Sequence, residues 1–128
     1  MSGAGEALRS AAMAALGAID GVGVYDGAPV QAALPYAIVE IGPESDWGHK
    51  SGAGRELRLA ATLRDKGERP ERLRALMAEA ESALTGLGGA LDGWRLVTMA
   101  MVRSRLVTPR AGEAWVGVVE FRARMLAE

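Results

Sequence analysis

The strongest constraint on the fold is a regular alternation of residue types near the C-terminus. Between residues 114 and 125, alternate positions are apolar or small, and this set comprises Trp115, Gly117, Val119, Phe121, Ala123 and Met125. The positions between them hold Val116, Val118, Glu120, Arg122 and Arg124. Because successive side chains of a β-strand point to opposite faces, the pattern predicts a strand that is buried on one face only.

A second stretch has the same period of two. Leu57, Leu59, Ala61 and Leu63 alternate with Arg58, Ala60, Thr62 and Arg64, which predicts a strand over 57–64. Further strands are predicted at 22–25, at 34–41 and at 94–108. Gly42-Pro43 is expected to close the strand at 34–41, and the segment 109–113 forms a hairpin turn before the last strand.

Two segments have the period of an amphipathic helix. In residues 6–19 the apolar positions recur every three or four residues, and alanine, an intrinsically good helix former, is frequent. A second helix is predicted to start at Pro70, after the charged turn 65–69, and to end before the glycines at 86–89. Residues 1–5 are small and polar and are expected to be a disordered lead.

These elements predict one α+β domain over residues 1–128, with a mixed, mainly antiparallel sheet, two amphipathic helices on one face and a long protruding hairpin. Two helices can cover only one face of such a sheet. The uncovered face would carry valines and the arginines Arg58, Arg64, Arg103, Arg105, Arg122 and Arg124. We interpret that face and the sheet edges as a surface for a protein partner.

Composition excludes several other classes of protein. The net charge of −1 lacks the excess of basic residues that sequence-independent nucleic-acid binding requires. No cysteine is present, so neither a disulfide framework nor a thiolate zinc site can form. The N-terminal residues lack the pattern of a secretory signal, and no apolar run reaches the roughly 20 residues of a membrane-spanning helix. We therefore expect a cytoplasmic protein without a membrane partner.

The segment 45–54 holds the only histidine, His49, between Asp46 and a glycine-rich stretch. One interpretation is a general base oriented by Asp46 or Glu44, or a metal site made of the same three residues. No serine lies in a nucleophile elbow, and the phosphate-binding lysine is missing after the glycines. The favoured interpretation is a flexible hairpin tip with no cofactor and no catalytic residue, in which Trp47 is either tucked under the loop or is an interface anchor.

Taken together, the elements resemble the tail-terminator, or tail-completion, proteins of siphophage-type particles and of gene transfer agents. The resemblance covers nearly the whole chain. It is carried by an N-terminal helix, Gly23-Val24-Tyr25-Asp26, Leu34-Pro35-Tyr36-Ala37-Ile38-Val39, Ser45-Asp46-Trp47, Ala61-Thr62-Leu63, a helix from Glu71 to Ala83-Leu84, Ser104-Arg105 and Val118-Val119-Glu120-Phe121-Arg122-Ala123-Arg124.

The resemblance implies a structural assembly protein and not an enzyme. Family members form a hexameric ring on the head-proximal end of the tail tube, where the ring stops tube growth and docks the tail to the head. The implied partners are further copies of the chain, the tube protein and the head stopper, with DNA passing through the lumen. After assembly in the cytoplasm, the protein would belong to the particle.

On this view the loop and the open sheet face form a protein interface. Its residues would be Asp46, Trp47, His49, Arg55, Arg58, Arg103, Arg105, Arg122 and Arg124. Two alternatives remain at this stage. One is a head-closure or stopper protein of the same size and class, and the other is a small enzyme or ligand-binding domain that uses His49 and Asp46.

Overall fold

The computed structural model describes residues 3–128 and has the predicted α+β architecture. Its elements are α1 (Ala4–Gly17), β1 (Gly23–Tyr25), β2 (Tyr36–Asp46), β3 (Gly54–Asp65), α2 (Glu71–Thr85), β4 (Gly89–Leu91), β5 (Trp94–Val107) and β6 (Trp115–Ala127). The six strands form one sheet in the order β1-β2-β3-β6-β5-β4. Neighbouring strands are antiparallel except β1 and β2, which are parallel.

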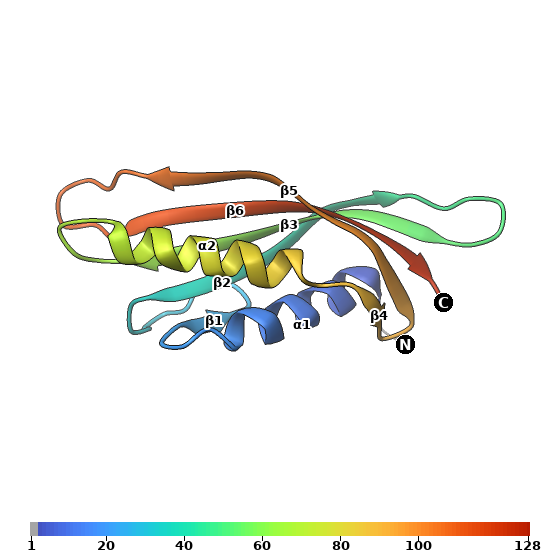
Figure 1. The fold of residues 1–128 in the computed structure, drawn as a ribbon, viewed down its shortest axis with the longest axis horizontal. Coiled ribbons are helices and arrows are strands. Elements are labelled where there is room, and N and C mark those ends of the chain that lie inside the picture. The colour runs from blue at the N-terminus through green and yellow to red at the C-terminus, as the bar shows by residue number, and fades with distance from the viewer. Residues whose placement is uncertain (1–2) are drawn as a thin grey trace.

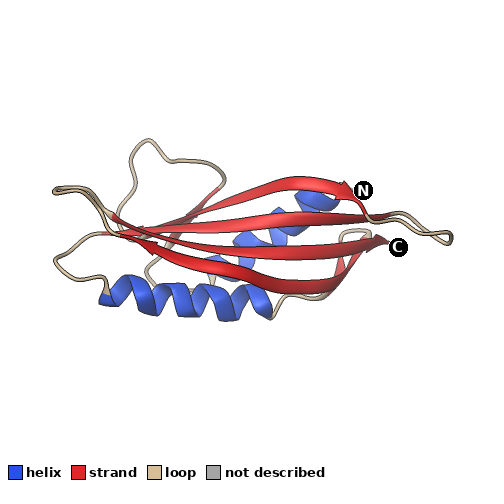
Figure 2. Cartoon of the chain, turned by 90° about the horizontal axis from the view of Figure 1, so that it is seen from above, coloured by secondary structure: helices blue, strands red, loops and turns tan. Residues whose placement is uncertain are grey.

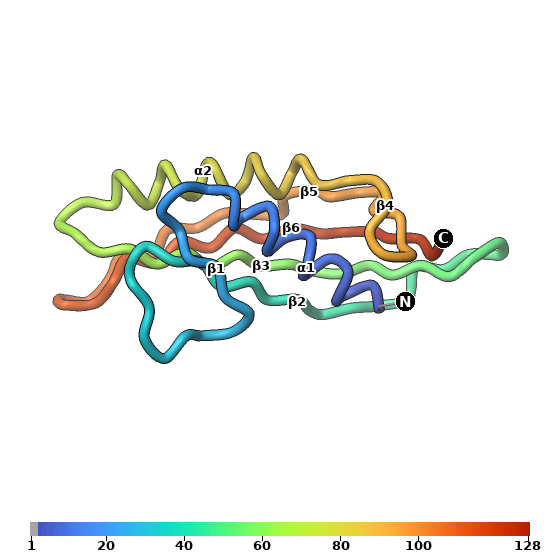
Figure 3. The backbone as a smooth tube through the Cα atoms, turned by 90° about the horizontal axis from the view of Figure 1, so that it is seen from below, coloured from blue at the N-terminus to red at the C-terminus, as the bar shows by residue number. Residues whose placement is uncertain are grey.

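The sheet is long and curved, and both helices lie on the same face of it (Figure 1). Helix α1 packs under β1, β2 and β3, whereas α2 packs under β3, β6 and β5, and the two helices contact each other. The view from the helix side shows α2 running along the sheet and α1 running obliquely beside it (Figure 3). The prediction of two helices on one face is therefore confirmed, and the opposite face carries neither helix.

The core is built on the central strand pair, β3 and β6. Leu59 lies opposite Phe121 in the antiparallel register, and Leu57, Ala123 and Met125 continue the same face. All five side chains are fully buried. Burial of a leucine or phenylalanine side chain stabilises a fold by about 1.5–3 kcal/mol. The apolar positions whose alternation predicted these two strands are thus the ones that are buried on the helix side of the sheet.

Strand β2 is longer than predicted. Gly42-Pro43 was expected to close it, but the strand continues to Asp46 through an irregularity between Ile41 and Glu44. Proline has no N–H for the ladder, and a bulge at the edge of a sheet accommodates it without ending the pairing. The expected strand end was wrong because β3 supplies a partner on the far side of the bulge.

The start of α1 also differs from the expectation of a disordered lead over residues 1–5. The helix begins at Ala4, which is buried, and Gly5 lies against β2. A Cβ at Gly5 would lie 3.2 Å from Oε1 of Glu44. Packing on the extended part of β2 orders these residues, and residues 1–2 lie outside the described part of the chain.

The short strand β4 was not predicted. It pairs with the start of β5 through the two-residue turn Asp92-Gly93, in which both residues have positive φ, 48° and 86°. An Asp-Gly pair between two strands is a common signal for such a turn. The glycines at 86–89 were expected to end the second helix and no element was predicted at 90–93, because a three-residue strand is too short to show a period.

The link from β3 to α2 is held by a partly buried ion pair. Nε of Arg72 donates a hydrogen bond of 2.7 Å to Oδ2 of Asp65, and Nη2 donates to Oδ1. These bonds, with a further one from the Lys66 backbone N–H, hold the pKa of the Asp65 carboxyl below its ordinary value. Nε1 of Trp115 donates to the Gly67 carbonyl oxygen at 3.0 Å, which ties β6 to the same link.

We predict that Asp65→Asn destabilises the fold by about 1–2 kcal/mol, because Asp65 is buried while Arg72 stays exposed to screening water. The folded-state pKa is lowered, so this contribution is present above the unfolded-state pKa and is lost as the pH falls through the folded-state value. Urea denaturation of the wild type and the variant from pH 7 to pH 2 measures it. The exposed Glu68→Gln is the control, and a difference between Asp65→Asn and wild type that does not change with pH would contradict the prediction.

Candidate assembly interface

The segment around His49 is the tip of the hairpin that joins β2 to β3, which confirms the hairpin interpretation. The backbone N–H of Trp47 donates to the Gly54 carbonyl oxygen at 2.9 Å, and His49 and Gly52 exchange backbone hydrogen bonds of 3.0 and 3.1 Å. The hairpin extends beyond the body of the sheet, next to the C-terminal end of β6 (Figure 1). It is attached there by a hydrogen bond of 2.9 Å from the Ala127 N–H to the Ala53 carbonyl oxygen.

The side chain of Trp47, at the base of this tip, packs against Arg124 of β6. The guanidinium carbon of Arg124 is 5.4 Å from the centroid of the indole, in the range of a cation–π contact, and Nε of Arg124 donates to Glu56 at 2.9 Å. The indole is half-buried, and the ring of His49 lies 6.4 Å away from it, centroid to centroid. Trp47 therefore keeps part of a large aromatic surface available at a protruding site.

Gly54 allows the hairpin to close. A Cβ at this position would lie 2.6 Å from the Trp47 carbonyl oxygen and 2.9 Å from Cδ2 of Leu126. No side chain fits there without a shift of the backbone.

We predict that Gly54→Ala destabilises the protein by about 1–3 kcal/mol, the usual range for overpacking a tight site. Gly52→Ala in the same tip is the matched control, since nothing lies within 4 Å of the added carbon and its φ is not positive. Thermal denaturation of both variants measures the difference. Equal melting temperatures for the two would show that the close approach at Gly54 does not constrain the hairpin.

The predicted arginines of the sheet share the face opposite the helices. In register, Arg58 faces Arg122 across β3 and β6, and Arg103 faces Glu120 across β5 and β6. Arg105 and Arg124 lie on alternate positions of the same face. Arg55 is different, because it lies on the other side of β3, where its Nε is 3.7 Å from Glu44.

Ion pairs occupy part of this open face. Glu56 forms ion pairs with Arg124 at 2.9 Å and with Arg122 at 3.8 Å. Arg103 forms an ion pair with Glu120 at 3.2 Å. Nε of Arg122 is enclosed and has no hydrogen-bond partner. An enclosed donor without an acceptor is costly, and the ion pair with Glu56 at 3.8 Å offsets part of that cost.

The geometry does not assemble a catalytic or metal site around His49. The Asp46 carboxylate accepts a hydrogen bond of 3.2 Å from the Gly48 backbone N–H, so it caps the turn. Within residues 3–128, no group of three His, Asp or Glu side chains could hold a metal ion. No helix among the described residues is long and apolar enough to cross a membrane.

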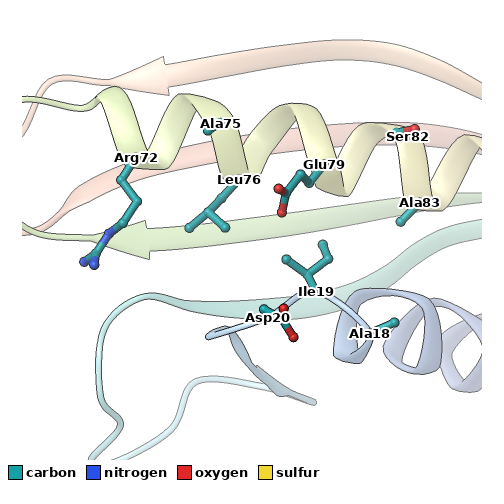
Figure 4. Close-up of a pocket in the computed structure, with 9 residues that line it drawn as sticks. All are labelled: Ala18, Ile19, Asp20, Arg72, Ala75, Leu76, Glu79, Ser82 and Ala83. Carbon is teal, nitrogen blue, oxygen red and sulfur yellow. The ribbon is translucent and has the colours of Figure 1, made fainter.

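A groove of about 740 Å³ between the end of α1 and α2 was missed by the sequence reasoning (Figure 4). It is lined by Ala18, Ile19, Asp20, Arg72, Ala75, Leu76, Glu79, Ser82 and Ala83. The signal in the sequence was the set of small side chains, Ala18, Ala75, Ser82 and Ala83, which fill little of the space between the end of α1 and α2. Arg72 is already bonded to Asp65, and the lining contains no histidine or cysteine, with Ser82 as its one hydroxyl group.

The second feature that sequence reasoning missed lies on β5. Four of its apolar side chains are exposed, namely Val97, Met101, Val102 and Val107. The alternation in this strand is broken by two register shifts, between Leu96 and Thr98 and between Met101 and Arg103. Because each shift changes which face the following residues point to, the alternation in the sequence does not predict the exposed positions.

The open arginine-bearing sheet face, the protruding hairpin and the exposed apolar side chains of β5 are surfaces of the kind that other proteins contact. The chain belongs to the family described as tail completion protein gp17, whose model matches residues 6–126. It is accordingly a structural tail-completion protein and not an enzyme. This agrees with the resemblance inferred from the sequence.

A solved structure, described as the virion of a native gene transfer agent particle, contains a chain with the same fold. The two chains are 26% identical, with a TM-score of 0.79, and the match covers 98% of this chain and 100% of the other. The comparison with curated proteins finds no match. The similarity to a particle component therefore extends over the whole domain.

Proposed function

We propose that this protein forms a closed ring at the head-proximal end of a tail tube, where it ends tube polymerisation and joins the tail to the head. The observation that supports this most directly is the family match over residues 6–126, together with full-length similarity to a chain of a gene transfer agent virion. On this proposal the protein assembles in the cytoplasm and then remains in a phage-like particle.

A single copy leaves surfaces that an assembly would cover. The open sheet face exposes Arg58, Arg103 and Arg105, and β5 exposes apolar side chains. A contact that joins one surface of a copy to a different surface of the next propagates, and it closes into a ring when the rotation per copy divides the circle. A ring is the assembly that caps a tube while leaving a lumen for DNA.

We assign the interface to the hairpin and the open face. The hairpin part comprises Asp46, Trp47, His49 and Arg55, and the face comprises Arg58, Arg103, Arg105, Arg122 and Arg124. The partners are further copies of the chain, the tube protein and the head stopper. Trp47 is the anchor, because aromatic side chains with partly exposed area dominate the energy of protein interfaces.

The proposal predicts that particles made without this protein have tail tubes of uncontrolled length that do not join heads. Electron microscopy of particles from producing cells, with and without the protein, measures tube length and head attachment. Native mass spectrometry of the purified protein on tube ends measures the number of copies in the ring. Unchanged tube length and unchanged head attachment in the absence of the protein would contradict the proposed function.

We predict that Trp47→Ala weakens assembly by about tenfold or more while changing the stability of the isolated protein little, because the indole lies at the hairpin base outside the core. Sedimentation measures assembly, and thermal denaturation measures stability. Lys50→Ala, an exposed position of the same tip outside the proposed interface, is the control. A loss of stability as large as the loss of assembly would contradict the anchor role of Trp47.

A further inference from the structure

Two long strand edges have no partner strand in the described chain. The short β1 pairs only with residues 36–38 of β2, so the edge of β2 is unpaired from Val39 to Asp46. The short β4 pairs only with residues 94–96 of β5, so the edge of β5 is unpaired from Val97 to Val107. Unpaired backbone groups on long edges are a template for a further strand, and proteins usually shield them.

The edge of β5 is apolar to an extent seen nowhere else on the described surface. Val97, Met101, Val102 and Val107 expose 47, 43, 44 and 38% of their area, and Val30 is the one other large apolar residue classed as exposed in residues 3–128. A groove of about 290 Å³ runs beside this edge between α2 and β5, with Met77 and Leu106 in its lining. The edge thus offers both backbone groups and apolar area to an incoming strand.

The two edges are opposite in charge. The unpaired part of β2 carries the exposed Glu40, Glu44 and Asp46, whereas the unpaired part of β5 carries the exposed Arg103 and Arg105. Glu40 and Arg103 also lie in one row across the sheet, because Glu40 faces Ala60, Ala60 faces Glu120, and Glu120 faces Arg103. A sheet continued by a second copy would bring Glu40 of that copy toward Arg103 and Arg105.

We propose that the β2 edge of one copy adds to the β5 edge of a second copy and continues the sheet from subunit to subunit. Three successive antiparallel pairings separate β2 from β5, so the two strands run in opposite directions and the new pair is antiparallel too. Every copy then has one donor edge and one acceptor edge, which makes the contact heterologous. This inference rests on the proposed ring and identifies the contact that closes it.

The irregularities of both edges restrict the register. Gly42-Pro43 interrupts the β2 edge, because Pro43 has no N–H to donate, and leaves two short pairing segments, Val39–Ile41 and Glu44–Asp46. The register shift between Met101 and Arg103 places an irregularity in β5 as well, beside the position of Arg103. Interrupted edges resist unspecific edge-to-edge aggregation and accept only a partner with matching breaks. A second copy, acidic where β5 is basic, has that complementarity.

A charge exchange between two variants tests the contact. Glu40→Arg makes position 40 basic beside an unchanged basic β5 edge, and the double variant Arg103→Glu/Arg105→Glu makes β5 acidic beside an unchanged acidic β2 edge. Neither variant alone is expected to form rings at concentrations where the wild type does, with assembly weakened about a hundredfold or more by like charges. An equimolar mixture is expected to form rings again, because each altered edge meets its opposite.

Native mass spectrometry of the mixture measures ring formation. Because the two variants differ in mass, it is also expected to show equal numbers of both in each ring, as alternation requires. Glu113→Arg, which makes the same charge change in the turn between β5 and β6, is the control and is expected to assemble normally. Rings formed by either variant alone, or no rings in the mixture of two variants that melt like the wild type, would overturn the proposed pairing.

A second measurement does not depend on the charge variants being stable. Since the chain has no cysteine, a thiol cross-linker joins only engineered positions. A mixture of Glu40→Cys and Arg105→Cys is expected to give cross-links between the two variants, whereas a mixture of Glu40→Cys and Glu113→Cys is not. Wild-type rings with correct tube length but no such cross-links would overturn the pairing and leave the proposed function standing. Absence of wild-type rings from tube ends would overturn the proposed function.

Discussion

The structure depends on the one-sided burial of the central strand pair, β3 and β6. Leu59 and Phe121 face each other across the pair and pack on the helix side, where the neighbouring alternate positions Leu57, Ala61, Ala123 and Met125 are fully buried. The opposite face of the same strands carries Arg58, Arg122 and other charged side chains. Because a second helical layer is lacking there, a stable core and a large open surface arise from the same alternation.

Local contacts then hold the ends of this layer in place. The Asp65–Arg72 pair and the Trp115–Gly67 hydrogen bond fasten one end, where β3 gives way to α2. At the other end, the hydrogen bond from Ala127 to Ala53 and the contact of Arg124 with Trp47 attach the hairpin to β6. The hairpin is therefore presented in a defined position beyond the sheet, as an interface element requires.

The sequence predicted the elements in which one periodicity runs without interruption. The alternation around Leu59 and Phe121 and the apolar stripes of both helices were enough to give the α+β class and the common face of Arg58, Arg103, Arg105, Arg122 and Arg124. The prediction failed where a segment is ordered by contacts with residues that are distant in the sequence. Ala4 is helical because β2 extends beneath it, and β2 extends because β3 pairs with it past Pro43.

The sequence by itself determined the fold class and the placement of both helices on one face, because periodicity and local turn residues encode these within a few neighbouring positions. The assembly family followed from the resemblance of the chain to known proteins. Only the tertiary structure decided which edges stay unpaired, which apolar side chains of β5 are exposed and how Glu40 lines up with Arg103. Strand order and register depend on pairings between residues far apart in the chain, and no single segment contains that information.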